Sequence, residues 1–315
     1  MRVFVAGASG ALGSRLVPQL IEAGHEVVGT HHAPASARLL EVLGAEPVRL
    51  DLLDARAVRT AVLDSRPDAI VHQATALADI TFGRNLDKTF TTTNRLRTEG
   101  TDALLAAARE AGVRRFVAQS ALYFRYARQG GPVKAEGDPL EETPPPNTAR
   151  SCAAIAHLEK VTTAFGGVAL RYGGFYGAAN DALIEPIRKR QFPIVGGGGG
   201  MFSWMHLDDG AAATVAALEH PGPAIYNIVD DEPAPVRDWL PVLADALGAK
   251  PPRHVPTWLA RLFAGPAAVV LGTQARGAAN ARAKRELGWT PRYPSWRLGF
   301  PATYSAIAVA DGPAG

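Results

Sequence analysis

The first thirteen residues contain three glycines whose spacing suits the binding of a diphosphate. Gly7, Gly10 and Gly13 read G-x-x-G-x-x-G. In such a turn one glycine allows a sharp bend, one lets backbone N–H groups approach phosphate oxygens, and one lets a helix pack closely on a strand. The phosphates then lie at the positive end of the helix. The pattern predicts a site for a dinucleotide.

The segments around these glycines are the ones that such a site requires. The apolar run 3–6 has the length of a strand, and the apolar positions Leu16, Val17, Leu20 and Ile21 repeat as they do in a helix. Strand, glycine-rich turn and helix follow one another in the order that gives the glycine pattern its meaning. An ordinary glycine-rich turn is the alternative, and the agreement of all three segments argues against it.

Further segments connect this pattern to a known family. The G-x-x-G-x-x-G spacing resembles the extended form of the short-chain dehydrogenase/reductase superfamily, in its epimerase/dehydratase-like branch. Segments that resemble the same branch are Asp51-Leu52 after a short strand, Pro67 to Ala74, Arg171 to Gly177, and Trp204 to Asp209. The resemblance covers roughly residues 1 to 300, and it implies a Rossmann-type fold.

The resemblance also implies which residues contact the cofactor. The expected pyrophosphate contacts are Gly7, Ser9, Gly10, Ala11, Leu12 and Gly13, and the expected adenine contacts are Asp51 and Leu52. Gln73, Ala74 and Thr75 are expected along the cofactor, and Ser120, Tyr172, Gly174 and Phe175 are expected near its nicotinamide end.

The end of the second strand bears on which nicotinamide cofactor is used. A site for NAD places an acidic residue there to bind the ribose 2′-hydroxyl. This chain has Thr30, His31 and His32 instead, with Ser36 and Arg38 nearby. Hydrogen-bond donors and positive charge suit a 2′-phosphate. The sequence therefore favours NADP, with NAD left open, and the alternative is that both histidines are ordinary exposed loop residues.

The pair that usually moves the proton in this superfamily is missing. Most members use Tyr-x-x-x-Lys on one helix, and no such sequence occurs here. Counting back from Glu159, which matches a glutamate that often follows the pair, places Ser151 at the tyrosine position and Ile155 at the lysine position. An isoleucine cannot assist ionisation. General acid–base assistance is worth on the order of 10²- to 10⁴-fold in rate, so its loss needs a replacement or a different reaction.

Two hydroxyl groups are the candidate replacements. Ser120 ends the fifth predicted strand, near the position where the family keeps a substrate-binding Ser or Thr, and Tyr126 lies in the following loop. We expect these two to be the catalytic residues, with an ordered water as a substitute. Packing of the tyrosine ring with its hydroxyl in water is the alternative for Tyr126. No metal site is predicted, because His206 and Asp208 fit the start of a helix better.

Composition excludes several classes of protein. The 315 residues are 47% hydrophobic, which suits a large core, and the net charge of +3 is spread along the chain. Because the basic residues are not massed with aromatic ones, no nucleic-acid partner is expected. One cysteine excludes a disulfide framework within the chain, and a reducing cytoplasm fits best. No run of eighteen uncharged apolar residues occurs, so no membrane segment is expected. A small-molecule substrate is expected, with a homodimer left open.

Strand-like and helix-like stretches alternate up to Arg171, which predicts an α/β, doubly wound parallel sheet. The predicted strands are 2–6, 26–30, 47–50, 69–72, 115–120 and 168–171, and the predicted helices are 13–23, 35–43, 55–64, 85–111 and 148–164. Residues 1–174 should form the dinucleotide domain, joined by a return segment at about 206–230. Residues 175–205 and 231–300 should form a smaller substrate lobe, and residues 301–315 are left as a tail.

Three functions fit this combination of an intact cofactor site and a missing pair. The first is an atypical NADP(H)-dependent oxidoreductase or epimerase/dehydratase-like enzyme acting on a carbonyl or hydroxyl group. The second is a catalytically silent redox sensor that binds the dinucleotide. The third is a non-redox catalyst, such as a cyclase or lyase, that uses the same pocket. Fold alone does not separate them.

Overall fold

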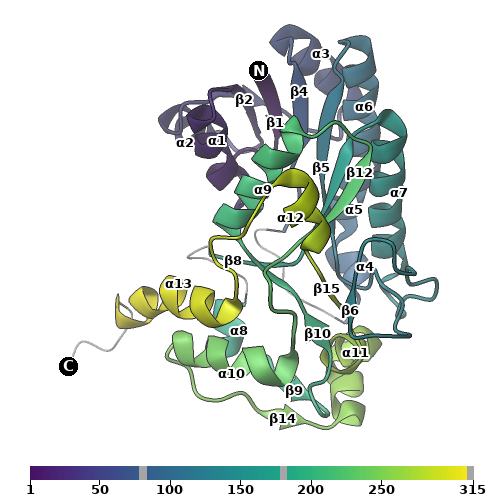
Figure 1. Cartoon of the computed structure of the whole chain (residues 1–315), viewed down its shortest axis with the longest axis vertical. Helices are drawn as coiled ribbons and strands as arrows, with labels where there is room; N and C mark the ends of the chain where they lie inside the picture. Colours follow the sequence, from purple (N-terminus) through teal and green to yellow (C-terminus); the bar gives the residue numbers. More distant parts are fainter. Residues whose placement is uncertain (78–83, 178–182, 311–315) are drawn as a thin grey trace.

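The chain folds around a seven-stranded parallel sheet (Figure 1). The structure is a computed structural model that describes residues 1–77, 84–177 and 183–310. The strands are β1 (Arg2–Ala6), β2 (Glu26–His31), β3 (Glu46–Arg49), β4 (Ala69–His72), β5 (Arg115–Ala121), β7 (Val168–Tyr172) and β12 (Ala224–Ile228), in the spatial order β12-β7-β5-β4-β1-β2-β3. All six neighbouring pairs are parallel. The predicted α/β, Rossmann-type class is confirmed.

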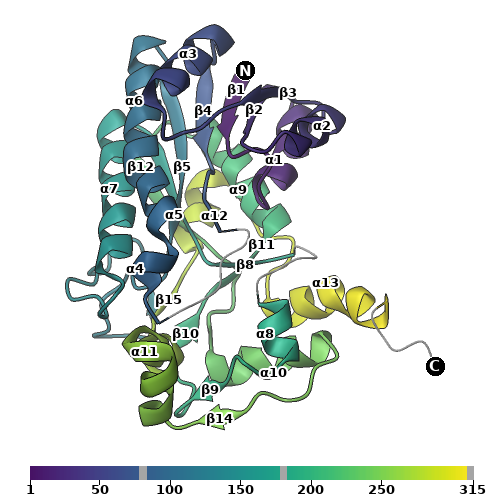
Figure 2. The same ribbon diagram turned by 180° about the vertical axis from the view of Figure 1, so that it is seen from behind.

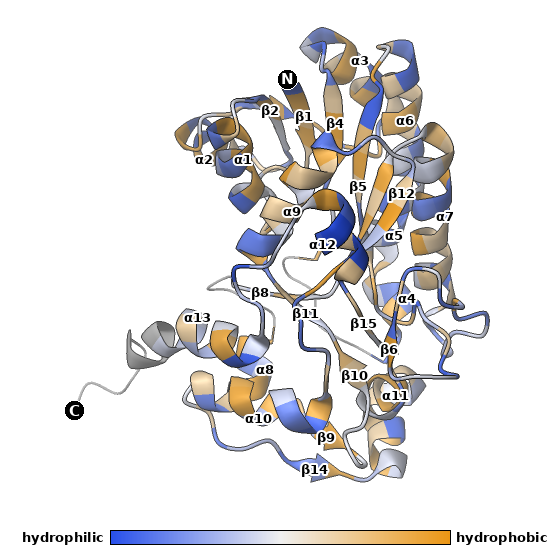
Figure 3. Cartoon of the chain, in the orientation of Figure 1, coloured by the Kyte–Doolittle hydropathy of each residue, from blue (hydrophilic) through white to orange (hydrophobic). Residues whose placement is uncertain are grey.

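Helices cover both faces of this sheet (Figures 1 and 2). One face carries α1 (Gly13–Glu22), α2 (Ala35–Val42) and α9 (Leu207–Glu219), and the other carries α3 (Ala55–Ser65), α6 (Thr101–Glu110) and α7 (Ala149–Phe165). In Figure 3 the strands between these helices are largely hydrophobic. A sheet buried on both faces needs continuous apolar strands.

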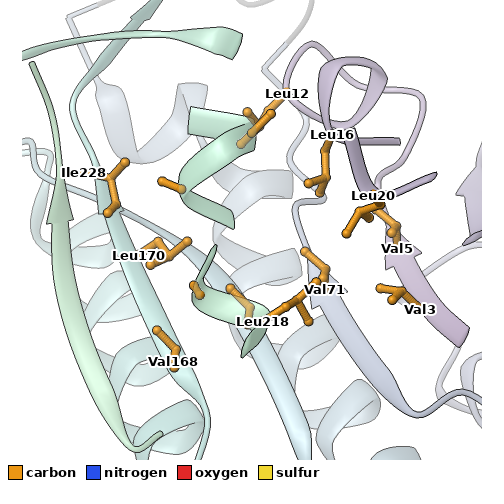
Figure 4. Packing of buried hydrophobic residues seen from close by; sticks show 14 of the residues in the cluster. Val3, Val5, Leu12, Leu16, Leu20, Val71, Val168, Leu170, Leu218 and Ile228 are labelled. Atoms are coloured by element: carbon orange, nitrogen blue, oxygen red, sulfur yellow. The ribbon is translucent and has the colours of Figure 1, made fainter. Parts of the chain in front are cut away.

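Strand β1 shows how one short segment contributes to two cores. Val3 and Val5 pack with α1 and α9 (Figure 4), whereas Phe4 and Ala6 pack on the side of α3 and α6. All four side chains are fully buried. Because successive side chains of a strand point to opposite faces, an unbroken apolar run is what this double burial requires.

The six predicted strands agree with the observed ones to within one residue at each end. For the seventh strand, β12, the sequence predicted only that residues 206–230 return to the dinucleotide domain. The predicted helix 85–111 is not continuous. It is divided into α4 (Leu86–Thr89), α5 (Thr91–Arg95), a π-helical turn η1 (Leu96–Gly100), and α6.

Threonine hydroxyls accompany the interruption of that helix. Thr98 donates to the carbonyl of Asn94 at 3.0 Å, and Thr101 donates to the carbonyl of Arg97 at 2.8 Å. Side-chain bonds to carbonyls four residues earlier compete with helical geometry. The wider π turn places Arg97 in the interior, where its exposed fraction is 2%, and such turns often occur at functional sites.

A second lobe lies beyond the carboxyl ends of the strands (Figure 1). Its strand pairs are β8 (Gly174–Tyr176) with β11 (Trp204–His206), β9 (Ile194–Val195) with β14 (His254–Val255), and β10 (Met201–Phe202) with β13 (Ala234–Pro235). Its helices are α8 (Ile184–Arg188), α10 (Val236–Ala246), α11 (Thr257–Thr273) and α13 (Trp296–Ala310). A core rich in tryptophan, including Trp204, Trp239 and Trp296, holds α10 and α13 together.

The remaining elements join the lobes, and the C-terminal residues form a helix that the sequence did not predict. Strand β6 (Val133–Lys134) pairs with β15 (Gly277–Ala278), and α12 (Ala281–Leu287) follows. The sequence left 301–315 as a tail, but α13 continues to Ala310. The apolar face of this helix includes Phe300 and Tyr304, which are buried against the second lobe.

In the described part of the chain, no helix is both long and apolar enough to cross a membrane.

The start of helix α9 is capped by a side chain. The helix begins after His206, whose Nδ1 accepts the N–H of Asp208 at 3.1 Å. The expected capping role of this segment is confirmed.

Candidate active site

Two of the three glycines fix the shape of the loop after β1. Gly7 has a φ of +86°, and a Cβ there would lie 2.6 Å from the Cα of Ala74. A Cβ at Gly13 would lie 2.3 Å from the carbonyl oxygen of Gly7. Both contacts are too short for any side chain, so these positions need glycine for close packing. The Oγ1 of Thr30 accepts the N–H of Gly7 at 2.9 Å and holds the turn from the side.

Gly10 has a different environment. The nearest atom to a Cβ at this position is the carbonyl oxygen of Gly7, at 3.3 Å, and the residue is exposed. Its outer side is therefore open, at the N-terminal end of α1, where N–H groups lack helical partners. Ser9, Ala11 and Leu12 complete this loop. A backbone cradle with an open face suits the pyrophosphate of a dinucleotide.

The strand order reverses beside this loop, between β1 and β4. Gln73, Ala74 and Thr75 follow β4 there. The side-chain amide of Gln73 is buried beside the hydroxyl of Tyr172, and it forms no hydrogen bond of ordinary geometry among the described residues. Ligands of open α/β sheets bind at such a reversal. This amide fits a cofactor lying across the sheet at this reversal.

The residues after β2 have separate positions. Thr30 is buried under the glycine loop, and His31 is buried with its Nδ1 donating to the carbonyl of Ala33 at 2.9 Å. His32 is exposed. On the neighbouring strand, Arg49 is the register partner of His31 and is exposed. The sequence analysis missed this arginine because the pairing of β2 with β3 is not visible locally.

The expected adenine contacts lie at the end of β3. Asp51 is exposed, and its carboxylate accepts the N–H of Leu53 at 2.9 Å. Leu52 is buried in the core under α3 and α6. This turn presents one carboxylate at the carboxyl edge of the sheet.

The expected nicotinamide contacts do not all face the same way. The hydroxyl of Tyr172 lies 2.6 Å from that of Thr214 on α9, and burial raises the pKa of Tyr172 well above its ordinary value. Phe175 lies closer to the glycine loop. A Cβ at Gly210 would lie 3.3 Å from both Leu12 and Phe175, so these side chains meet on one turn of α9. Gly174 packs against the ring of Trp204.

Ser120 and Tyr126 belong to one buried polar cluster. Ser120 donates to Glu159 at 2.7 Å, and Glu159 also forms a two-bond ion pair with Arg171 at 2.7 and 2.8 Å. Arg171 donates to the hydroxyl of Tyr126 at 3.0 Å, and this hydroxyl donates to Asn227 at 2.7 Å. Proton transfer by either hydroxyl would require these bonds to break. Their catalytic role stays a prediction.

The positions of the missing pair are buried at the start of α7. The hydroxyl of Ser151 donates to Asp87 at 2.9 Å and accepts from Asn94 at 3.1 Å. Asp87 also accepts the N–H groups of Arg150 and Ser151, which cap the helix. Ile155 is fully buried. The sequence gave no signal for Asp87 or Asn94, because both reach Ser151 from a segment more than fifty residues away.

Comparison with protein families agrees with this geometry. The model of the NAD dependent epimerase/dehydratase family matches residues 3–229. The 3-diazoavenalumate denitrifying reductase of a Streptomyces species is 42% identical over 312 residues, which cover 95% of this chain and 99% of the relative. A 4-hydroxy-2-methyl-3-oxo-4-farnesyl-3,4-dihydroquinoline-1-oxide ketoreductase from Stigmatella aurantiaca is 30% identical over 266 residues, covering 79% and 74%.

Among solved structures, the chain has the fold of sugar-nucleotide epimerases. The UDP-glucose 4-epimerase of Thermotoga maritima, solved with UDP-glucose, aligns with a TM-score of 0.78 at 19% identity, covering 98% of this chain and 99% of the other. The Thermus thermophilus enzyme of the same name, in complex with NAD, aligns with a TM-score of 0.73 at 23% identity, covering 99% and 100%.

The glycine geometry predicts different effects for substitutions three residues apart. Gly13→Ala should lower the free energy of unfolding by about 1–3 kcal/mol through overpacking, whereas Gly10→Ala should leave it nearly unchanged. Gly10→Asp should keep the fold but abolish dinucleotide binding, because its carboxylate would face the phosphates. Urea unfolding and calorimetry measure these effects. Undiminished cofactor affinity in Gly10→Asp would contradict the assignment of the loop.

The buried cluster predicts a large and pH-dependent stability change. Burial acts to raise the pKa of Glu159, but the hydrogen bonds and charge of Arg171 outweigh it and hold this pKa below the ordinary value. Glu159→Gln should therefore cost about 3–5 kcal/mol at neutral pH, since it leaves a buried arginine unpaired.

The pH dependence follows from the lowered pKa. The contribution of Glu159 is complete above its unfolded pKa near 4.3 and is lost as the pH falls through the lower folded value. Urea unfolding of wild type and variant at pH 7 and pH 3 checks this. The exposed Glu99, paired with Arg95, provides the control, since an exposed ion pair contributes little and Glu99→Gln should leave stability nearly unchanged. Equal effects of the two substitutions would contradict the prediction.

Proposed function

The chain belongs to the NAD dependent epimerase/dehydratase family, and from that premise we propose that it reduces an aromatic diazonium substrate with release of N₂. Its relatives include named reductases and epimerases, and the chain is an NAD(P)-dependent, oxidoreductase-like enzyme. This is the first of the three functions that the sequence left open. The name of the Streptomyces relative, similar over almost its whole length, describes a diazo compound, a reduction and a removal of nitrogen.

The proposal depends on which residues occupy the two positions of α7 where most members of the superfamily have tyrosine and lysine. These residues are Ser151 and Ile155. Ser151 is 1% exposed and its hydroxyl is bound to Asp87, and Ile155 is fully buried and apolar. Reducing a carbonyl group builds negative charge on oxygen, which a proton donor must neutralise. A reaction that develops no such charge has no need of the missing pair.

Reduction of a diazonium carbon is a reaction of that kind. When bound, the reduced nicotinamide supplies a hydride, one C–H bond replaces one C–N bond, and both nitrogens leave as N₂, so that no proton is consumed. The protein has to bind the substrate, orient it and exclude water. A buried isoleucine and a fully bonded serine exclude water at this point without offering a proton.

Two features of the glycine loop and its surroundings support a dinucleotide cofactor. The open face at Gly10 would receive the pyrophosphate, and the buried amide of Gln73 would face the cofactor at the strand reversal. We assign residues 1–174, with 206–230, to this cofactor domain and residues 175–205 and 231–300 to the substrate lobe. Among the contacts expected from the sequence, Phe175 has the position best suited to the nicotinamide end.

For the phosphorylated cofactor, the support is electrostatic. The end of β2 has no acidic residue, and the exposed His32 and the neighbouring Arg49 offer donors to a 2′-phosphate. Arginine keeps its charge at all physiological pH values and binds phosphate oxygens in pairs. NADP is therefore the proposed cofactor.

The reaction is tested with NADPH deuterated at C4 and an arenediazonium carboxylate. We expect one N₂ for each NADPH oxidised and deuterium in the new C–H bond. Reactions without protein and with Gly10→Asp control for spontaneous reduction. Ser151→Ala should keep the rate within about threefold, whereas loss of a general acid would cost about 10²- to 10⁴-fold. Turnover of 3-oxoalkanoates but not of the diazonium, with a large loss in Ser151→Ala, would replace this proposal by a ketoreductase in which Ser151 and Asp87 move the proton.

The cofactor preference is tested by removing one charge. Arg49→Met should weaken NADP binding by roughly tenfold or more, the magnitude of a hydrogen bond between charged groups, and leave NAD binding unchanged. Calorimetry with both dinucleotides measures the ratio. Lys160→Met, on the exposed side of α7, is the control. A wild type that binds NAD as tightly as NADP would refute the preference.

A further inference from the structure

Arg97 is a buried cation for which the described residues supply no counter-ion. It lies in the π-helical turn η1 with 2% of its surface exposed. Its Nη1 donates to the hydroxyl of Tyr123 at 2.8 Å, and its guanidinium lies 5.7 Å from the centre of that ring. Its Nε is buried without a hydrogen-bond partner, and no carboxylate of the described residues forms an ion pair with it. Such a charge is unfavourable unless something compensates it.

A second buried arginine shows how this fold compensates a cation for structural purposes. Arg171 is also 2% exposed, but Glu159 binds it through two hydrogen bonds, and Tyr126 accepts a third. Among the described residues, the side chain of Arg97 is hydrogen-bonded to the neutral hydroxyl of Tyr123 and to no carboxylate. The difference indicates that the partner of Arg97 is not part of the described fold.

The described side chains around Arg97 are neutral. His72 lies close by, with its Nε2 3.2 Å from the carbonyl oxygen of Leu96. Burial lowers the pKa of His72 to about 4, so it is neutral at physiological pH. The ring of Tyr123 stacks on Phe90 at 5.7 Å and meets Phe124 edge-on at 6.2 Å. The cation therefore lies against a wall of aromatic side chains.

Arg97 is also connected to the proposed reaction site. Asn94, three residues earlier, donates to Ser151 at the former tyrosine position. Tyr123 follows β5 by two residues, at the carboxyl edge of the sheet where ligands of this fold bind. A group bound at Arg97 would thus lie beside the substrate position, and not at the glycine loop that receives the pyrophosphate.

We propose that Arg97 and Tyr123 form an anion subsite that binds the carboxylate of a flat, aromatic substrate. The guanidinium fork matches the two oxygens of a carboxylate, and the tyrosine hydroxyl can donate to one of them. The aromatic side chains around Tyr123 make the surroundings of this subsite apolar. The inference rests on the proposed function for the place of the substrate, and it adds the chemical class of the substrate's anchoring group.

The test compares a carboxylic acid with its ester. trans-Cinnamate and methyl trans-cinnamate are titrated by calorimetry into the protein saturated with oxidised dinucleotide, so that no turnover is needed. We expect the acid to bind at least tenfold more tightly than the ester. Arg97→Met should remove this difference by lowering acid affinity roughly 10- to 100-fold, with ester affinity unchanged. Arg95→Met is the matched control, because Arg95 is exposed and paired with Glu99 on the same helix.

Thermal unfolding without ligand gives a second readout. Arg97→Met should leave the midpoint unchanged or raise it, because it removes an uncompensated charge, whereas Arg171→Met should lower it. Equal binding of acid and ester to wild type, or binding of neither, would overturn the subsite. A loss of dinucleotide affinity in Arg97→Met would instead assign the arginine to the cofactor and also overturn it. Acid selectivity without N₂ release would leave the subsite standing and defeat the diazo reaction alone.

Discussion

The carboxylate of Glu159 holds the central part of the molecule together. It lies on α7 and binds Arg171 on β7, Arg125 in the loop after β5, and Ser120 on β5. A charge buried this deeply is tolerated only when its partners are fixed, so the helix can occupy one position along the sheet. That position sets where the first turns of α7 lie. The positions of Ser151 and Ile155 therefore depend on an ion pair that later turns of the same helix make.

The two buried arginines differ in how the fold compensates their charge. Arg171 is satisfied within the fold, and its network extends through Tyr126 to Asn227 on β12, which ties the last strand to the others. Arg97 donates to the hydroxyl of Tyr123, which follows β5, but lacks an acidic partner among the described residues. A protein accepts an unsatisfied buried group where a ligand completes it. The same residue type thus has opposite implications, depending on what surrounds it.

The fold constrains the chemistry less than the side chains do. Solved epimerases share the whole architecture at 19% to 23% identity, and fold by itself does not assign a reaction. The groups that bear on the reaction of this chain lie at the carboxyl edge of the sheet. Ile155 on α7 is apolar and fully buried, the hydroxyl of Ser151 donates to Asp87, and the outer side of Gly10 is open. This combination favours hydride acceptors that need no acid.

The sequence alone determined the features that depend on neighbouring residues. Apolar runs and glycine spacing predicted the strands, the turn and the doubly wound sheet, because backbone geometry and side-chain alternation act over a few residues. Only the tertiary structure decided the polar contacts. Ser151 meets Asp87 across 64 residues, Tyr126 meets Asn227 across 101, and Arg97 meets Tyr123 across 26. Such pairs depend on which segments pack side by side and on an irregular π turn, and no local pattern encodes either.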